Sequence, residues 1–282
     1  MNTPDVAELK YIAQAMPQRD PALDVSQNHY WVYHQLDPLL ACKQPVTESV
    51  DEDLFIAVHQ ACEIAFHQMV LDMQRALSAL RIAFAASDQP VGDVEEAAYF
   101  LKRVLHFWDV VNRTMPILNG MRGFAEFRTG IGPGSGFQSW QFRHIEIMSG
   151  IRHVYWQGGT ADAQGKPHVA ETEFQRRHGA DIALWLADHE HHSLRAYWDI
   201  LRARADLATL QAHASASAFM GLLARFDVAQ KLFHQGHLAL AVRQLAIVGV
   251  EIGTGGSSFK EYLAKYGKEI APLFIDLPNI EA

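Results

Sequence analysis

The sequence has little cysteine, no excess of positive charge and no long uninterrupted apolar run. Its only two cysteines, Cys42 and Cys62, exclude a disulfide framework and a zinc site built mainly on thiolates, so we expect a reducing, cytoplasmic location. With 24 basic and 32 acidic residues, the net charge of −8 argues against nucleic acid as the main partner. No apolar run approaches the roughly 20 residues that span a bilayer, and no signal-peptide core opens the chain. We therefore expect no membrane partner and a small-molecule ligand.

The hydrophobic residues, 49% of the 282, recur at helical spacing rather than in strict alternation. The pattern predicts an all-α protein. Helices are expected over residues 52–84, 93–111, 138–149, 171–186, 192–208 and 216–250. No repeat, low-complexity tract or long linker divides the chain, so we expect one helical-bundle domain over residues 46–282. Residues 1–45 are expected to form a segment that packs on a neighbouring subunit.

Fifteen histidines raise the question of a metal or cofactor. The densest group, residues 188–192, is consecutive, and consecutive helical side chains point about 100° apart, so they cannot converge on one ion. We expect a solvated helix start there. No glutamate is followed three residues later by a histidine, which excludes the Glu-x-x-His pairs of a carboxylate-bridged di-iron bundle. His-Glu-x-x-His and Cys-x-x-Cys-His motifs are absent as well.

Two glycine-rich stretches, residues 130–136 and 253–256, interrupt the helical pattern. Neither has the Gly-x-Gly-x-x-Gly spacing, neither leads into Gly-Lys-Ser/Thr, and neither lies between a strand and a helix. A phosphate-binding loop is therefore not predicted. By composition alone the two stretches are helix-breaking turns.

Four blocks, in order along the chain, give these loops a more specific meaning. They are Tyr30–Asp37 with Gln44-Pro45; Asp53–Gln60 with Glu63; Phe127-Arg128 with Gly132–Ser139, Arg143, Ile145 and Glu146; and Gly253–Ser258, with an echo at Pro272–Phe274. In these blocks the sequence resembles the haem-dependent tryptophan 2,3-dioxygenase family, whereas residues 152–225 match less well. The resemblance implies an all-α protein that binds haem b and uses O₂ to convert L-tryptophan, or a close analogue, to N-formylkynurenine.

The resemblance also implies a histidine ligand for the haem iron on the helix before Gly253. Counting back without gaps places Leu240 at that position, and leucine cannot bind iron. His237 has the family's spacing to a basic residue, Arg243, six positions on, and a three-residue insertion before Gly253 restores the match. The expected axial ligand is therefore His237, with His234 in reserve. Without an axial ligand, the alternative is a non-catalytic helical protein that binds haem or an indole.

Substrate contacts follow from the same resemblance. His59 is expected to hydrogen-bond the indole N–H, and Phe55, on the same helix face, to pack on the indole ring. Arg128 is expected to pair with the substrate carboxylate, for which its planar guanidinium is suited, and Thr254 to lie near the substrate ammonium. Without the family motif, His59 would be a core histidine and Arg128 a surface ion-pair partner.

Tyr30 and Tyr33 correspond to family residues that reach into a neighbour's active site. The resemblance therefore implies a homotetramer. The plain alternative for both tyrosines is aromatic packing.

Phe124 departs from the family pattern. One turn before the carboxylate-binding arginine, many members carry a tyrosine whose hydroxyl also reaches the carboxylate. Its loss removes a contact worth on the order of 1–3 kcal/mol. A haem-dependent aromatic monooxygenase acting on a modified indole or another aromatic amino acid is therefore a second candidate.

Overall fold

Every regular element in the described part of the chain is helical, which confirms the predicted all-α class. The computed structural model describes residues 30–85, 93–128, 139–152, 173–249, 272–274 and 277, without the side chains of 173–177. The elements are α2 (Tyr30–Tyr33), α3 (Leu36–Ala41), α4 (Val50–Ala85), α5 (Glu95–Thr114), the 3₁₀ helix η1 (Met115–Gly120), α6 (Phe124–Phe127), α7 (Trp140–Ser149), α8 (Glu173–Asp188), α9 (Leu194–Arg204), α10 (Leu207–Ala212) and α11 (Ala214–Val248).

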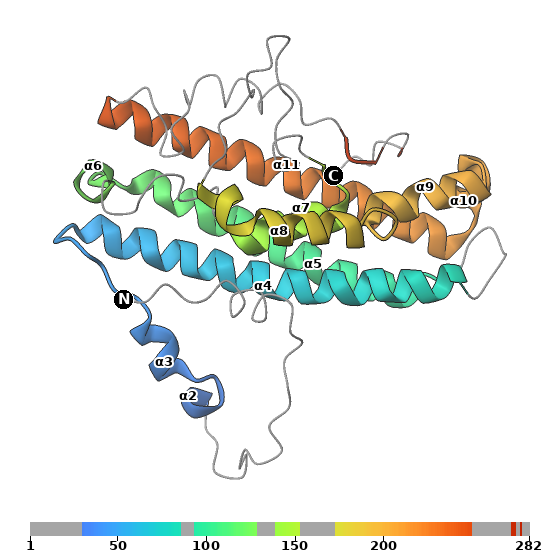
Figure 1. Ribbon diagram of the computed structural model, residues 1–282, viewed down its shortest axis with the longest axis horizontal. Helices are drawn as coiled ribbons and strands as arrows, with labels where there is room; N and C mark the ends of the chain where they lie inside the picture. Colours follow the sequence, from blue (N-terminus) through green and yellow to red (C-terminus); the bar gives the residue numbers. More distant parts are fainter. Residues whose placement is uncertain are drawn as a thin grey trace.

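Three long helices form the frame of the bundle, with α5 packed against both α4 and α11 (Figure 1). Trp108 on α5 is fully buried, and its ring contacts Phe66 of α4, Phe226 of α11 and Phe142 of α7 at centroid distances of 6.1–6.4 Å. Large aromatic side chains bury about 150–250 Å² each, so this cluster contributes strongly to the packing of four helices. The short helix α7 is thereby held inside the bundle, against α4.

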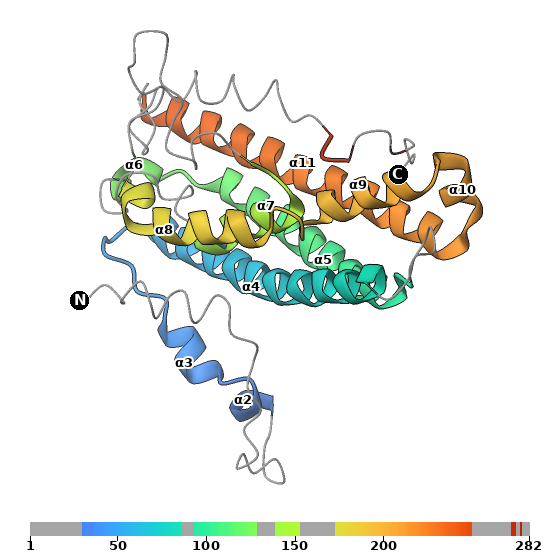
Figure 2. The same cartoon turned by 45° about the vertical axis from the view of Figure 1, so that its right-hand side comes forward.

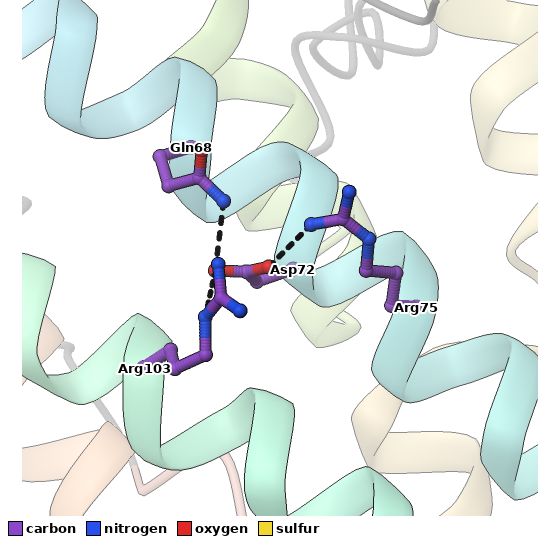
Figure 3. Close-up of polar contacts among 4 residues, drawn as sticks. All are labelled: Gln68, Asp72, Arg75 and Arg103. Carbon is purple, nitrogen blue, oxygen red and sulfur yellow. Dashed lines mark hydrogen bonds and ion pairs between the residues drawn. The ribbon is translucent and has the colours of Figure 1, made fainter. Parts of the chain in front are cut away.

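Polar contacts add to the apolar packing between α4 and α5 (Figure 3). The Asp72 side chain of α4 has no solvent exposure. One carboxylate oxygen accepts from Arg75 at 2.7 Å, and the other accepts from Gln68 and from Arg103 of α5, each at 3.0 Å. Because a buried carboxylate is costly to desolvate unless it is paired, the cluster ties α5 to α4 at a defined register.

The predicted helix over residues 192–208 is wrong as a single element. It divides into α9 and α10, because Asp206 is extended and its side chain accepts a hydrogen bond from the Thr209 backbone N–H at 2.8 Å, which starts a new helix. Residues 189–192 lie in the turn between α8 and α9 rather than at a helix start. The helix predicted to end at residue 250 ends at Val248, since Gly249 adopts a left-handed φ of 70° and caps it.

The arm formed by α2 and α3 extends away from the bundle in both views (Figures 1 and 2). Its large apolar side chains are exposed, with Tyr30 at 73% and Tyr33 at 60%. The chain joins α4 at Glu52, whose carboxylate accepts hydrogen bonds from the backbone N–H groups of Val46 and Thr47 at 2.9 and 2.7 Å. The entry into α4 is therefore fixed, whereas the arm itself buries almost none of its own apolar surface.

Among the described helices, α4 alone is long and apolar enough to cross a membrane by length and composition. Its residues Met69, Val70 and Met73 are fully buried in the protein core. A core helix of a soluble protein meets the same criteria, so one such helix is weak support for a membrane span.

Candidate functional site

His59 lies on α4 in a fixed orientation. Its Nδ1 is 2.8 Å from the Phe55 carbonyl oxygen, and a carbonyl can only accept, so Nδ1 carries the proton and Nε2 carries the lone pair. Burial lowers the pKa of His59, while the Phe55 carbonyl and the nearby Glu63 carboxylate act in the opposite direction. The side chain is therefore a neutral imidazole that presents a hydrogen-bond acceptor at Nε2.

Aromatic rings line the region beside His59. The Phe55 ring lies 4.0 Å from the His59 ring, 5.3 Å from Phe127 and 6.1 Å from Phe124, measured between ring centroids. Phe124 and Phe127 pack edge to face at 5.5 Å. Helices α4 and α6 thus supply a continuous aromatic wall in which Phe124 and Phe127 are buried and Phe55 is the partly exposed ring, the one available to pack on a flat apolar ligand.

Hydrogen bonds between the start of α4 and the residues just before α6 hold α6 against this wall. The Asp51 carboxylate accepts hydrogen bonds from the backbone N–H groups of Arg122 and Gly123 at 2.7 and 2.6 Å, and these bonds lower the pKa of Asp51. The approach is close enough that a Cβ at residue 123 would lie 2.8 Å from the Ser49 hydroxyl oxygen. Glycine at position 123 therefore permits the contact that positions Phe124.

Arg128 is half-buried at the C-terminal end of α6. Its backbone N–H donates to the Phe124 carbonyl at 3.0 Å, which keeps the two residues one helical turn apart. Phe124 is 9% exposed and packs with Phe55, so no hydroxyl is present at that position of the wall. Arg128 thus follows directly after the two aromatic residues of α6, Phe124 and Phe127.

His237 lies on α11, and its ring stacks 5.9 Å from Phe233 with an interplanar angle of 13°. Burial lowers the pKa of His237 to about 4, and the neighbouring groups His59, His234 and Arg143 act in the same direction by disfavouring a second positive charge. Phe233 also contacts Phe66 of α4, edge to face at 5.8 Å between ring centroids, so α4 and α11 meet beside His237. At neutral pH His237 is an uncharged imidazole, the form that binds a metal.

His234 and Leu240 have different surroundings. The Nε2 of His234 lies 3.5 Å from a carboxylate oxygen of Glu146, and its ring contacts Phe142 at 5.5 Å. Leu240 is buried in the core. The outer ring nitrogen of His234 thus faces a carboxylate, which favours His237 as the ligand of the two histidines.

The donor set fits haem better than other iron or zinc centres. Burial raises the pKa of the Cys62 thiol to about 12, so it stays protonated, and Cys42 is on the exposed arm. Over the described ranges there is no group of three or more His, Cys, Asp or Glu side chains that could hold a metal ion. Haem iron needs as few as one protein ligand, and neutral His237 together with His59 and an aromatic wall meets that need.

Some residues predicted for the site are not brought to it. Thr254 lies outside the described residues. Tyr30 and Tyr33 are on the arm, and their ring contacts are with His34, at 4.5 and 5.0 Å. These positions fit the expectation that both tyrosines serve another subunit, which stays a prediction.

Two polar features near the site had no predicted role. Gln141 of α7 donates to the carboxylate and the backbone carbonyl of Glu63, at 2.9 and 2.7 Å, and its amide oxygen lies 2.9 Å from Nδ1 of His67. The other feature is the buried ion pair between Arg143 and Glu146. The signal for this pair was in the sequence, since opposite charges three residues apart on a helix lie on neighbouring turns and can pair.

Comparison with known proteins gives consistent matches. A family model described as tryptophan 2,3-dioxygenase matches residues 16–190. A protein named tryptophan 2,3-dioxygenase from Ruegeria pomeroyi is 27% identical over 267 residues, covering 84% of this chain and 86% of the relative. One of the same name from Exiguobacterium sibiricum is 25% identical over 273 residues, with the same coverage. One from Anaeromyxobacter sp. is 36% identical over 135 residues, 47% of this chain and 48% of the relative.

Proposed function

Because the chain belongs to the tryptophan 2,3-dioxygenase family, we propose that it is a haem-dependent enzyme that cleaves the indole C2–C3 bond of L-tryptophan and places one atom of O₂ on each of the two carbons, to give N-formylkynurenine. The observation that carries the proposal is the aromatic packing of two histidines on helices that meet: the His59 ring packs on Phe55 of α4, the His237 ring stacks on Phe233 of α11, and Phe233 contacts Phe66 of α4 at 5.8 Å between ring centroids. The equation balances without any further reductant, since tryptophan and O₂ together contain every atom of the product.

His237 holds haem b through its iron, and haem supplies the redox chemistry with O₂. The low pKa of His237 keeps the imidazole free of a proton that would compete with the metal. Phe233 stacks on the His237 ring and limits its rotation. The protein would therefore offer haem iron one pre-oriented imidazole, His237.

His59 orients the substrate. Since its Nδ1–H is committed to the Phe55 carbonyl, its Nε2 accepts a hydrogen bond from the indole N–H. Phe55 packs against the indole ring and helps to exclude water. Both residues are on α4, so the acceptor and the packing surface are held by one rigid element.

Arg128 binds the substrate carboxylate, and Thr254 lies near the ammonium group. A guanidinium suits a carboxylate because it offers two parallel N–H donors. With phenylalanine at position 124, the carboxylate has one polar contact fewer than in members that carry tyrosine. Amino-acid binding therefore depends more heavily on Arg128.

The N-terminal segment, residues 1–45, completes the pocket of a neighbouring subunit in a cytoplasmic homotetramer. Support comes from the arm itself, whose aromatic residues Tyr30, Trp31 and Tyr33 are exposed and extend away from the bundle (Figure 2). Contiguous exposed apolar surface is typical of an interface with another chain. A truncated chain without residues 1–35 should therefore lose both assembly and activity, and a fully active monomer would refute this part of the proposal.

Phe124 favours one alternative, an aromatic monooxygenase that acts on a modified indole or another aromatic amino acid. One experiment separates the candidates: anaerobic reconstitution with haem, incubation with L-tryptophan and ¹⁸O₂, and mass spectrometry of the product. Two labelled oxygen atoms support the dioxygenase, and one supports the monooxygenase. Haem binding without a labelled product points to a non-catalytic binding protein.

Loss of the five-coordinate ferrous spectrum in His237→Ala, but not in His234→Ala, would support the ligand assignment.

A further inference from the structure

Helix α7 carries charged residues into the interior of the protein. Arg143 and Glu146 are both buried, with Glu146 fully inaccessible to solvent. Removing two charges from water costs several kcal/mol per ion unless partners compensate. A helix that only filled the core would contain apolar residues at these positions, so the pair requires a local explanation.

The Glu146 carboxylate joins two helices. One oxygen, Oε2, lies 2.7 Å from a guanidinium nitrogen of Arg143, one turn earlier on α7. The other, Oε1, lies 3.5 Å from Nε2 of His234 on α11. Arg143 also lies with its guanidinium over the Phe142 ring, 4.8 Å from the ring centroid, which restricts its position. The carboxylate is therefore held on α7 and aimed at α11.

His234 and His237 are three residues apart on α11. This spacing corresponds to a rotation of about 300° and a rise of about 4.5 Å, so their side chains emerge from nearly the same face on successive turns. A contact that fixes the His234 side chain consequently restricts rotation of α11 about its own axis at His237. The positive charge of Arg143 also reaches His237, and Glu146 is placed to neutralise it.

We propose that Glu146, held by Arg143, is a positioning residue for His237: through His234 it sets the rotation of α11, and so the orientation of the imidazole offered to the haem iron. The proposal rests on the proposed function, because it takes His237 as the axial ligand. Partners outside the direct ligands usually alter metal affinity by about 10–100-fold when they are removed.

Gln141 offers a matched control on the same helix. Its amide hydrogen-bonds Glu63 and His67, which both lie on α4, the helix that carries His59. Gln141→Ala therefore removes polar contacts of α7 without touching the His234 contact. If Glu146 acts as proposed, its variant affects the α11 side, where His237 lies, whereas the Gln141 variant affects α4, where His59 lies.

The test uses the haem-reconstituted full chain, with the iron–histidine stretching frequency from resonance Raman spectroscopy, the reduction potential and the rate of haem transfer to apomyoglobin as readouts. For Glu146→Gln we expect a lower stretching frequency, a higher reduction potential because a negative charge near the iron is lost, and about tenfold faster haem loss. Gln141→Ala should leave the stretching frequency unchanged. Equal changes in both variants, or no change in Glu146→Gln, would overturn the proposal.

A second variant covers the case in which Glu146→Gln does not fold. His234→Phe removes the same contact from the α11 side while keeping a ring against Phe142, and we expect it to lower the stretching frequency as well. An unchanged frequency in His234→Phe refutes the proposal. Failure of the proposed function is seen separately: wild type would lack a five-coordinate ferrous spectrum, or His237→Ala would retain it.

Discussion

Replacing Asp72 by asparagine tests whether α4 and α5 are held by charge as well as by apolar packing. The substitution keeps the side-chain shape but puts an amide where three donors now converge, from Gln68, Arg75 and Arg103 (Figure 3). Removing one partner of a fully buried ion pair costs about 3–5 kcal/mol. Here the side chains of Arg75 and Arg103 are 31% and 38% exposed, so water can solvate them after the carboxylate is lost. We therefore expect a smaller loss, about 2–3 kcal/mol in the free energy of unfolding.

The arginine variants sharpen this prediction. Arg75→Ala and Arg103→Ala should each cost about 1 kcal/mol, because the remaining arginine still neutralises Asp72. The double variant leaves the carboxylate buried without a cation and should cost more than the two single losses together. Urea unfolding followed by circular dichroism, at equal haem saturation, measures all four variants. A loss below about 0.5 kcal/mol for Asp72→Asn, or strict additivity of the arginine variants, would refute the reasoning.

Three further predictions concern the site and its surroundings. Arg128→Ala should raise KM for the amino-acid substrate steeply and for its decarboxylated analogue much less; equal effects on both would make the arginine structural. Phe124→Tyr should improve turnover of L-tryptophan by restoring a hydroxyl beside Arg128, and steady-state kinetics that show no gain would contradict the missing-contact argument. Burial lowers the pKa of His144 to about 3, far below that of an unfolded chain, so the unfolded state binds the extra proton and stability falls as pH drops from about 6.5 towards 3. The His144→Phe variant keeps a ring stacked on Trp185 but cannot bind the proton. The difference between its urea midpoints at pH 7 and pH 5 should therefore be smaller than the difference in wild type. If the two differences are equal, His144 is not the titrating group.

Helix positions were predictable because apolar periodicity and capping residues act locally. The spacing around Phe55 and Cys62 predicted residues 52–84, and the structure has Val50–Ala85. The break at Asp206 was missed because its capping bond to Thr209 interrupts a pattern whose apolar residues continue on both sides. Helix α6 was missed because four residues are too few to show a period.

The site was predictable only to the extent that its residues lie in recognisable blocks. His59 and Phe55 share one helix, so their proximity follows from spacing alone. The contact of the Glu146 carboxylate with His234 joins residues nearly 90 positions apart, and the contact of Phe66 on α4 with Phe233 on α11 joins residues farther apart still, so both depend on tertiary packing. Nothing in local spacing encodes such contacts, so the bridge by Glu146 became visible only in three dimensions.

The two cysteines differ so much in exposure that one of them, Cys42, can be labelled selectively to follow the arm formed by α2 and α3. Cys62 is buried with a thiol pKa of about 12, whereas Cys42 is exposed just after α3. Thiol reagents react with thiolates, so a fluorescent maleimide at neutral pH should label Cys42 alone. A dye at that one position would sense whether the arm is free in solution or covered by another protomer. Its emission and anisotropy, followed during dilution, would then report assembly without any change to the sequence.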